Sequence, residues 1–430
     1  MPLMYYICFD STAGKTGRPN KWLALASLLM ALGIMLTVGC QKTDETIAED
    51  KLEIGLLLPL SGAASSAGES AQAGATLALQ DVSDYLNTTG SELKIEFIIK
   101  DTGSDPGMAL QKLEELDGQG VRFFIGPYSS ADASATLDYA NQQGIVLLSP
   151  SSVASSLAIA NDNLFRLVPS DGNQAEAMSA LFGHDGIETV IPIVRNDVWG
   201  EGLIDEVTPI LEQQGKTVVT PIQYEPSNVN SADIAAQVAS AINQALQQSP
   251  AEQVAVYLLS FGEGASILSA AAQEPDCALV KWYGSSAFAN NANLIEDPAA
   301  AQFALQQGLR CPSFAPDPAA TDLWAPIEQQ LTSQLARAPE VFALTSYDAV
   351  WLMVQAYRDC ATPSNTQSFR SALRQTAKYH YGITGRATFD NAGDRKYAFF
   401  EFWGLSQDNG GFKWESFGHY DNSNGQLDIN

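Results

Sequence analysis

Histidine and cysteine are scarce in this chain of 430 residues, with three and five copies. His184, His380 and His419 stand far apart and form no close cluster with cysteines, so the sequence predicts no metal site. No Gly-x-Ser-x-Gly motif occurs, and no histidine lies in a loop that follows a predicted strand, so acyl-transfer chemistry lacks its base. We therefore expect neither catalysis nor a cofactor.

Basic residues are also few. The chain has 23 Lys and Arg against 49 Asp and Glu, which gives a formal net charge of −26. This charge repels phosphate backbones, so nucleic acid is not an expected partner. The acidic residues are spread along the chain, which is typical of a solvated surface; a cationic ligand or a saline habitat is the alternative explanation.

An uncharged run of 18 mostly apolar residues extends from Trp22 to Gly39, and it follows Lys15, Arg18 and Lys21. Basic, then apolar, then small residues predict an export signal in residues 1–39. The run is just long enough to span a membrane, so an uncleaved anchor is the alternative. The sequence LTVGC at 36–40 resembles the lipobox of bacterial lipoproteins, with threonine where leucine is usual. The resemblance implies an exported protein that is lipid-anchored through Cys40 on the periplasmic face, with residues 40–50 as a tether.

Strand and helix signals alternate after this segment. Short branched apolar runs are separated by runs with helical spacing, in two similar successive sets, which predicts an α/β fold with parallel sheets covered on both faces. The predicted strands are 52–58, 93–100, 121–125, 145–148, 165–168, 190–194, 217–224, 254–259 and 279–283, and predicted helices include 69–86, 107–116, 174–182, 202–213, 234–246 and 264–272. Helices at 323–335 and 342–357 then precede strands at 386–389, 397–403 and 412–419, with a hairpin turn at 409–411.

Small hydroxyl side chains gather where predicted strands end. Ser129 and Ser130 follow one strand, and Ser151 and Ser152 follow the next. The carboxyl ends of parallel strands meet at one edge of a sheet, where the amides of helix N-termini are also free, and this combination suits a carboxylate or another anion. The alternative is that these serines only cap helices.

Several segments together resemble type I periplasmic binding proteins, in the leucine/isoleucine/valine-binding branch that serves ABC transporters. They follow one another in the family's order and include IGLLLPLSG at 54–62, FIGPYSS at 124–130, GIVLLSPSS at 144–152, FRLVPSD at 165–171, WGEG at 199–202 and TGRATFDNAGDR at 384–395. The resemblance covers about 51–421. It implies two Rossmann-like lobes, the periplasmic binding protein-like I fold, joined by a three-crossing hinge.

The resemblance also implies where the lobes begin and end. The crossings fall near 169–172, 312–316 and 383–385. One lobe would comprise 51–169 plus 316–383, and the other 172–312 plus 386–424.

The ligand site is implied by the same resemblance. Hydroxyls and amides of the first lobe would hold the carboxylate of an amino acid, while Val153 stands where a threonine is usual. The second lobe would supply two aromatic side chains. Its carboxylate for the ligand ammonium is replaced by Ser286, so Asp171 or Glu263 is expected to take that role. The expected ligand-binding residues are Ser129, Ser130, Ser151, Ser152, Asp171, Trp199, Phe261, Glu263 and Ser286.

These inferences converge on an extracytoplasmic solute-binding lipoprotein of an ABC importer. Its implied partners are an amino acid or amide-like small ligand, an ABC permease, and the membrane through the N-terminal lipid. The alternative is a non-transport lipoprotein on the same fold that regulates or senses for a partner such as a cell-wall enzyme. Cys277 and Cys311 each flank a predicted strand, so the sequence allows a disulfide between them, with Cys360 free.

Overall fold

The computed structural model describes residues 51–408 and 411–430 of the chain. The predicted export signal, the tether with Cys40, and the first two residues of the predicted 409–411 turn lie outside the described residues. Within those residues, no helix combines the length and the apolar character that a membrane span requires.

Five parallel strands form the first sheet, in the order β2-β1-β3-β4-β5. Leu56 and Leu58 of β1 face a core with helices α2 and α12, whereas Leu57 faces a core with α3 and α4, because successive side chains of a strand point to opposite faces. The elements are β1 (Lys51–Leu58), α2 (Ser65–Thr88), β2 (Lys94–Asp101), α3 (Pro106–Asp117), β3 (Phe123–Ile125), α4 (Ser130–Gln143), β4 (Val146–Ser149) and β5 (Leu164–Arg166).

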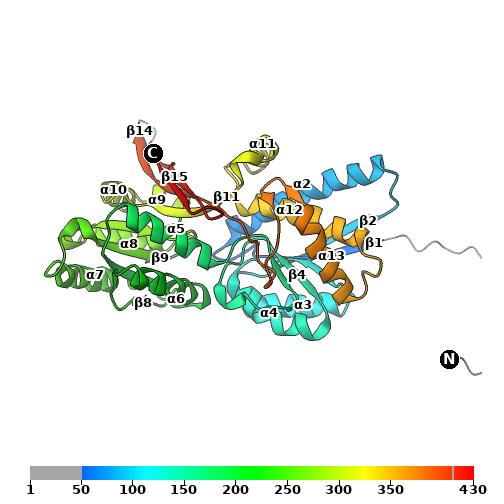
Figure 1. Cartoon of the computed structure of the whole chain (residues 1–430), viewed down its shortest axis with the longest axis horizontal. Helices are drawn as coiled ribbons and strands as arrows, with labels where there is room; N and C mark the ends of the chain where they lie inside the picture. Colours follow the sequence, from blue (N-terminus) through cyan, green and yellow to red (C-terminus); the bar gives the residue numbers. More distant parts are fainter. Residues whose placement is uncertain (1–50, 409–410) are drawn as a thin grey trace, which may run out of the picture. The chain divides into compact units, whose positions relative to one another are not determined.

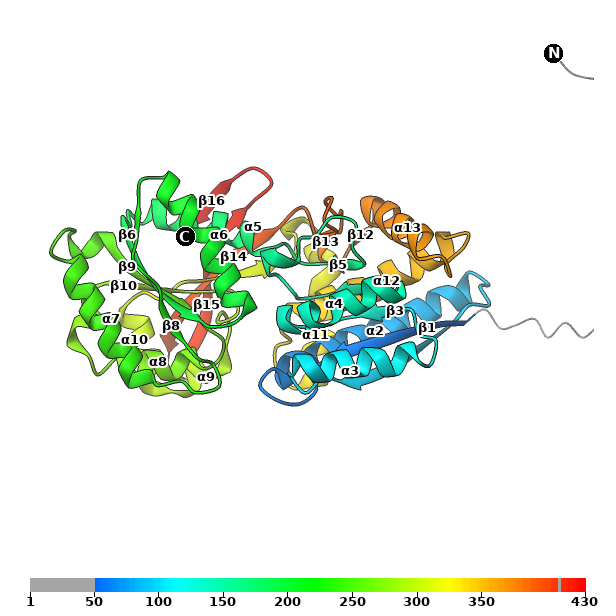
Figure 2. The ribbon, with the colours of Figure 1, turned by 90° about the horizontal axis from the view of Figure 1, so that it is seen from below.

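Two helices from a distant part of the chain complete this layer. Helices α12 (Phe342–Asp359) and α13 (Thr366–Tyr379) pack against the core that α2 shares with the sheet. Figure 1 shows α12 beside the blue α2, and α13 packs against α12. Figure 2 shows α3 and α4 lying over β1 and β3. The first sheet is therefore covered on both faces.

The second sheet is parallel as well, in the order β10-β9-β6-β7, with β8 also paired to β6. Ile191 and Ile193 of β6 pack against α7, α8 and α10, and Val190 and Val194 pack against α5 and α6. The elements are α5 (Asp171–His184), β6 (Thr189–Arg195), α6 (Val198–Gln213), β7 (Thr217–Val218), β8 (Ile222–Tyr224), α7 (Ser231–Ala245), β9 (Val254–Leu259), α8 (Gly264–Ala271), β10 (Lys281–Gly284), α9 (Ala292–Glu296) and α10 (Pro298–Gln306).

A third, antiparallel sheet has the order β11-β14-β15-β16. Strand β11 occupies the segment that the sequence predicted as the second crossing, and its last residue Ala315 pairs with Phe399, the first residue of β14. The remaining elements are β11 (Cys311–Ala315), α11 (Thr321–Leu335), β12 (Tyr381–Gly382), β13 (Gly385–Arg386), β14 (Phe399–Asp408), β15 (Gly411–Asp421) and β16 (Gln426–Ile429).

The predicted α/β class with two parallel, doubly covered sheets is confirmed. Ala387 and Phe389 pack against the core of the first sheet, beyond the residues expected to form the third crossing. The disulfide that the sequence allowed is not formed: Cys277 and Cys311 are buried and free, and Cys360 is free and half-buried, within the chain that the structure describes.

Candidate functional site

The four candidate serines follow β3 and β4, and most of their hydroxyls already serve the protein. Ser129 is the N-cap of α4, where its Oγ accepts a hydrogen bond from the amide of Asp132 at 3.0 Å. Ser151 donates its hydroxyl to the carbonyl oxygen of Tyr128 at 2.7 Å. The helix-cap reading of the sequence therefore describes Ser129, and Ser151 holds one loop to the other.

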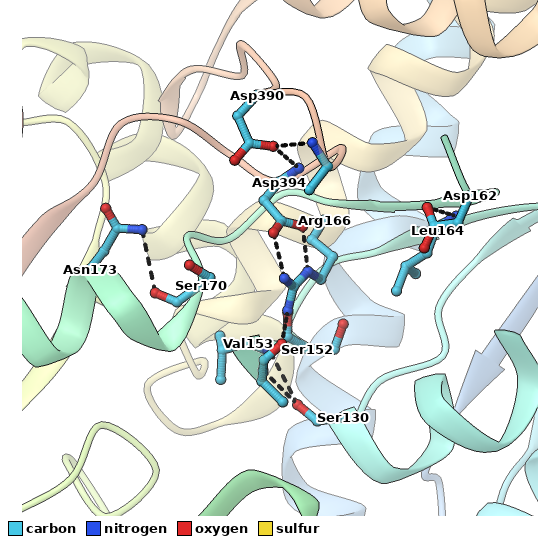
Figure 3. Close-up of polar contacts among 12 residues, drawn as sticks. Ser130, Ser152, Val153, Asp162, Leu164, Arg166, Ser170, Asn173, Asp390 and Asp394 are labelled. Atoms are coloured by element: carbon cyan, nitrogen blue, oxygen red, sulfur yellow. Dashed lines mark hydrogen bonds and ion pairs between the residues drawn. The ribbon is translucent and has the colours of Figure 1, made fainter. Parts of the chain in front are cut away.

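Ser130 fastens the loop after β4 to the start of α4. Its Oγ accepts hydrogen bonds from the amides of Val153 at 3.2 Å and Ala154 at 3.1 Å (Figure 3). Ser152 differs from its neighbours, because its Oγ is buried and finds no hydrogen-bond partner among the described residues. An unpaired buried hydroxyl is costly, and among the four candidate serines only Ser152 has one in the described structure.

Val153 connects this loop to the second sheet's helices. Its carbonyl oxygen accepts a hydrogen bond from the amide of Asp171 at 2.7 Å. Its side chain packs against the core cluster that contains Trp199 and Phe261. The valine thus makes an apolar contact where the family's threonine would offer a hydroxyl.

Asp171 begins α5 and is 1% exposed. One of its carboxylate oxygens, Oδ2, has no hydrogen-bond partner within the described residues. Burial raises the pKa of Asp171 to about 7, against the opposing effects of the Arg166 charge and a hydrogen bond from the Trp199 side chain. The structure therefore holds a carboxylate that would gain from any cationic or hydrogen-bond-donating group placed beside it.

Two further polar side chains lie in the same buried region, and sequence reasoning missed both. Gln174 accepts a hydrogen bond from the amide of Ser286 at 3.1 Å, which ties α5 to the loop after β10. The Nε2 of Gln174 and the hydroxyl of Tyr257 are both buried, and a hydrogen bond between the two side chains opposes the rise that burial gives the pKa of Tyr257. Gln174 stands one helical turn after Asp171, and this spacing is the signal that could have found it.

Trp199 and Phe261 form an aromatic pair. Their ring centroids are 4.9 Å apart with an interplanar angle of 41°. Trp199 is positioned by the N-cap of α6, where Asp197 accepts hydrogen bonds from the amides of Trp199 and Gly200. The guanidinium carbon of Arg195 lies 4.2 Å from the centroid of Phe261. The two rings predicted from separate segments are thus in contact.

Glu263 is committed to other groups. Its Oε1 accepts hydrogen bonds from the guanidinium of Arg195, from the hydroxyl of Tyr224 at 2.9 Å and from the amide of Phe261 at 3.2 Å. Arg195 also pairs with Asp197. Glu263 therefore orients Phe261 and neutralises Arg195, which leaves Asp171 as the stronger of the two expected counter-charges.

An ion pair holds the loop that carries Ser152. Arg166 at the end of β5 pairs with Asp394 through both carboxylate oxygens, and its Nη1 donates to the carbonyl oxygens of Ala154 at 2.7 Å and Ser152 at 3.4 Å (Figure 3). Asp390 accepts a hydrogen bond from the amide of Asp394 at 3.0 Å. The loop's position is therefore set by residues far away in the sequence.

Contacts connect the elements around the first parallel sheet with those around the second. Helix α6 contacts α4 and the short 3₁₀ helix η1 (Ser155–Leu157) of the first half. Together with the hydrogen bond from Asp171 to Val153, this brings the serine loops and the aromatic pair into one region. Across residues 51–408 and 411–430, no cluster of three His, Cys, Asp or Glu side chains could hold a metal ion.

Comparison with known proteins gives a family match. A family model described as periplasmic binding protein matches residues 51–404. An uncharacterized protein of Methanocaldococcus jannaschii is 25% identical over 419 residues, which cover 92% of this chain and 97% of that protein. The chain spans about half the length of several curated relatives, among them a leucine-, isoleucine-, valine-, threonine- and alanine-binding protein of Pseudomonas aeruginosa, at 24% identity.

Solved structures show the same fold. A branched-chain amino acid transporter substrate-binding protein from Streptococcus pneumoniae, solved with isoleucine, superposes with a TM-score of 0.65 at 20% identity, covering 85% of this chain and 99% of that one. A solute-binding protein of an ABC transporter from Rhodopseudomonas palustris, solved with 3,4-dihydroxybenzoic acid, superposes with a TM-score of 0.68 at 16% identity, covering 87% and 98%.

Proposed function

The chain belongs to the periplasmic binding protein family, and on that premise we propose that it is the solute-binding component of an ABC importer. Its ligand in this proposal is an amino acid or a related small polar molecule, taken up between the two lobes. The ligand would contact Ser152 and the amides around it from one lobe, and Trp199, Phe261 and Asp171 from the other.

The buried carboxylate of Asp171 is the observation that carries this proposal. A carboxylate that is 1% exposed, with an oxygen that has no partner in the described chain, is destabilised until a donor reaches it. A ligand ammonium would supply that donor and would pair with the charge. Gln174 and Tyr257 add a buried amide and a buried hydroxyl, which suits a ligand that carries both donors and acceptors.

The Ser152 hydroxyl fits the other end of such a ligand. It lies on the loop that Ser130 and Arg166 hold in place, so a carboxylate bound there would meet a donor that needs little rearrangement. The aromatic pair Trp199–Phe261 offers apolar surface for a side chain. The ligands named for the two solved structures, isoleucine and 3,4-dihydroxybenzoic acid, both combine a carboxylate with a hydrocarbon framework, aliphatic in one and aromatic in the other.

A thermal-shift screen at pH 8 tests the proposal, with a panel of amino acids, amides and aromatic acids. We expect stabilisation by a compound that carries both a carboxylate and an ammonium or amide group. Stabilisation by aromatic acids alone would move the ligand class to acids without a cationic group. If no compound in the panel raises the melting temperature of the natural chain or of Asp171→Asn, the amino acid proposal fails.

We further propose that the protein is exported, lipid-anchored through Cys40, and partnered by an ABC permease. Metabolic labelling with palmitate tests the anchor, with Cys40→Ser as the control that should lose the label. Co-purification of a permease tests the transport role against the regulatory alternative, which predicts a cell-wall enzyme instead.

A further inference from the structure

A cavity of about 280 Å³ lies away from the proposed ligand site, between α12 and α13. Gln355 and Asp359 stand one turn apart at the end of α12 and form one wall. Ala372 stands on the opposite helix, where its small side chain leaves room between the two. The complete lining is Gln355, Asp359, Ala372, Gln375, Thr376, Tyr379, His380 and Tyr381.

The lining residues carry one formal negative charge. Among its residues, all of them described, Asp359 is the only one charged at neutral pH, because burial lowers the pKa of His380 and keeps the imidazole neutral. Asp359 is the last residue of α12, so the free carbonyl groups of the helix end add partial negative charge beside its carboxylate. The oxygens of the two amide side chains can accept hydrogen bonds from a cation, and the two tyrosine rings can stack on it.

Positive charges also stand around the groove: Lys378 lies at its rim, and the charges of Arg386 and Arg395 act on the lining residue Tyr381. The ammonium of Lys378 lies 5.5 Å from the centroid of the Tyr379 ring. Tyr379 is 72% exposed and Tyr381 is 43% exposed, so both rings keep surface for a second cation. Lys378 opposes a cationic ligand electrostatically, and its removal should therefore strengthen binding.

We propose that this cavity, called the α12/α13 groove, binds a small organic cation such as a primary amine. The groove adjoins the segment that leads to the third crossing. His380 forms part of its wall, and on the far side Asp348 accepts hydrogen bonds from the amides of Ile383 at 2.8 Å and Thr384 at 2.9 Å. A ligand bound in the groove would therefore alter packing next to the connection between the lobes.

The test uses the full chain, purified in detergent, and 1,4-diaminobutane as the probe in isothermal titration calorimetry. Uncharged 1,4-butanediol is the control ligand. We expect Asp359→Asn to weaken diamine binding roughly tenfold, as expected when a cation loses its only formal counter-charge. Lys378→Ala should strengthen it severalfold. Asp138→Asn, an exposed carboxylate on α4, is the matched control and should have no effect.

Hydrogen exchange of the backbone amides shows which residues the bound diamine protects. Binding in the groove should slow exchange in residues 371–387 and leave residues 126–154 unchanged. Asp171→Asn should bind the diamine as the natural chain does. If Asp171→Asn abolishes binding while Asp359→Asn does not, the diamine occupies the interlobe site and the groove proposal fails. Equal binding of the diol, or an equal loss with Asp138→Asn, would also overturn it.

Discussion

Arg166 and Asp394 form a buried bidentate ion pair although 228 residues separate them in the chain. Arg166 is fully buried and also donates to the carbonyl oxygen of Ala154 in the serine loop. The pair thus joins the end of the first sheet, the loop that carries Ser152 and the segment that leads into β14.

Breaking this pair should destabilise the protein strongly. Asp394→Ala would leave the Arg166 guanidinium buried without its counter-charge, and we expect the free energy of unfolding to fall by about 3–5 kcal/mol. Urea denaturation measures the change. The double variant Arg166→Met/Asp394→Leu removes both charges, so its free energy of unfolding should fall by less. An equal or greater fall would show that the pair stabilises the protein mainly through its hydrogen bonds to the loop.

The free protein should become less stable as the pH rises towards neutrality, because of Asp171. Its folded-state pKa is raised to about 7, so the folded state binds the proton more tightly than the unfolded state. The contribution of Asp171 to the free energy of unfolding is therefore fully present below about pH 4. It is lost between about pH 4 and pH 7, by roughly 4 kcal/mol at most. Asp171→Asn should remove this part of the pH dependence, measured as melting temperature against pH. Parallel curves for the two proteins would contradict the assignment.

Ligand binding should show the opposite pH dependence. A cationic ligand pairs only with ionised Asp171, so its affinity should rise between about pH 6 and pH 8 and binding should release a proton near pH 6. Calorimetry in buffers of different ionisation enthalpy measures the proton. An affinity that falls over this range would indicate that Asp171 stays protonated and donates to an acidic ligand.

Ser130 and Ser152 should separate stability from binding. Ser130→Ala removes the acceptor for two amides, so the free energy of unfolding should fall by about 1–3 kcal/mol. Ser152→Ala removes no hydrogen bond recorded in the described chain, so it should change stability by less than about 0.5 kcal/mol. Ser152→Ala should nevertheless abolish the ligand-induced rise in melting temperature. Full retention of that rise would remove Ser152 from the site.

Asp171 and Glu263 should differ as partners of the ligand. Glu263→Gln keeps an acceptor for Tyr224 and Phe261, and Arg195 keeps Asp197, so ligand affinity should change only a few-fold. Asp171→Asn should lower affinity at least about tenfold. Calorimetry with the ligand from the screen compares the two isosteric changes directly. The reverse order would make Glu263 the counter-charge.

The three described cysteines should react unequally with iodoacetamide. Burial raises the pKa of Cys277 to about 12 and also raises that of Cys311, and both side chains are inaccessible. Cys360, at the end of α12, is half-buried. Mass spectrometry of labelled native protein should find modification at Cys360 first, with the other two labelled only after unfolding. Early labelling of Cys311 would reveal local opening around β11.

The sequence predicted most of the first nine strands because their signal is local. Buried parallel strands such as β6 and β9 are continuous branched apolar runs, and the helices between them repeat with helical spacing. Strand β11 was missed because the family resemblance implied a crossing there, whereas the strand forms by pairing with β14. A pairing partner far away in the chain leaves no local signal.

The contact between the two serine-bearing loops was predictable because both loops follow strand ends. Ser129, Ser130, Ser151 and Ser152 follow adjacent strands and meet as expected. Their separate roles could not be predicted, because they depend on which amides the folded loops bring within reach. Likewise, the sequence offered Asp171 and Glu263 as equals, and only the position of Arg195 distinguishes them.

The register between β11 and β14 also constrains how the halves of the molecule can move. Ala315 and Phe399 stand opposite each other at the end of the β11–β14 ladder. A hydrogen-bonded two-stranded ribbon bends across its face far more readily than its strands slide past each other. Any opening should therefore be a bend about this edge, and fluorophores on opposite sides would report separations that change along one path.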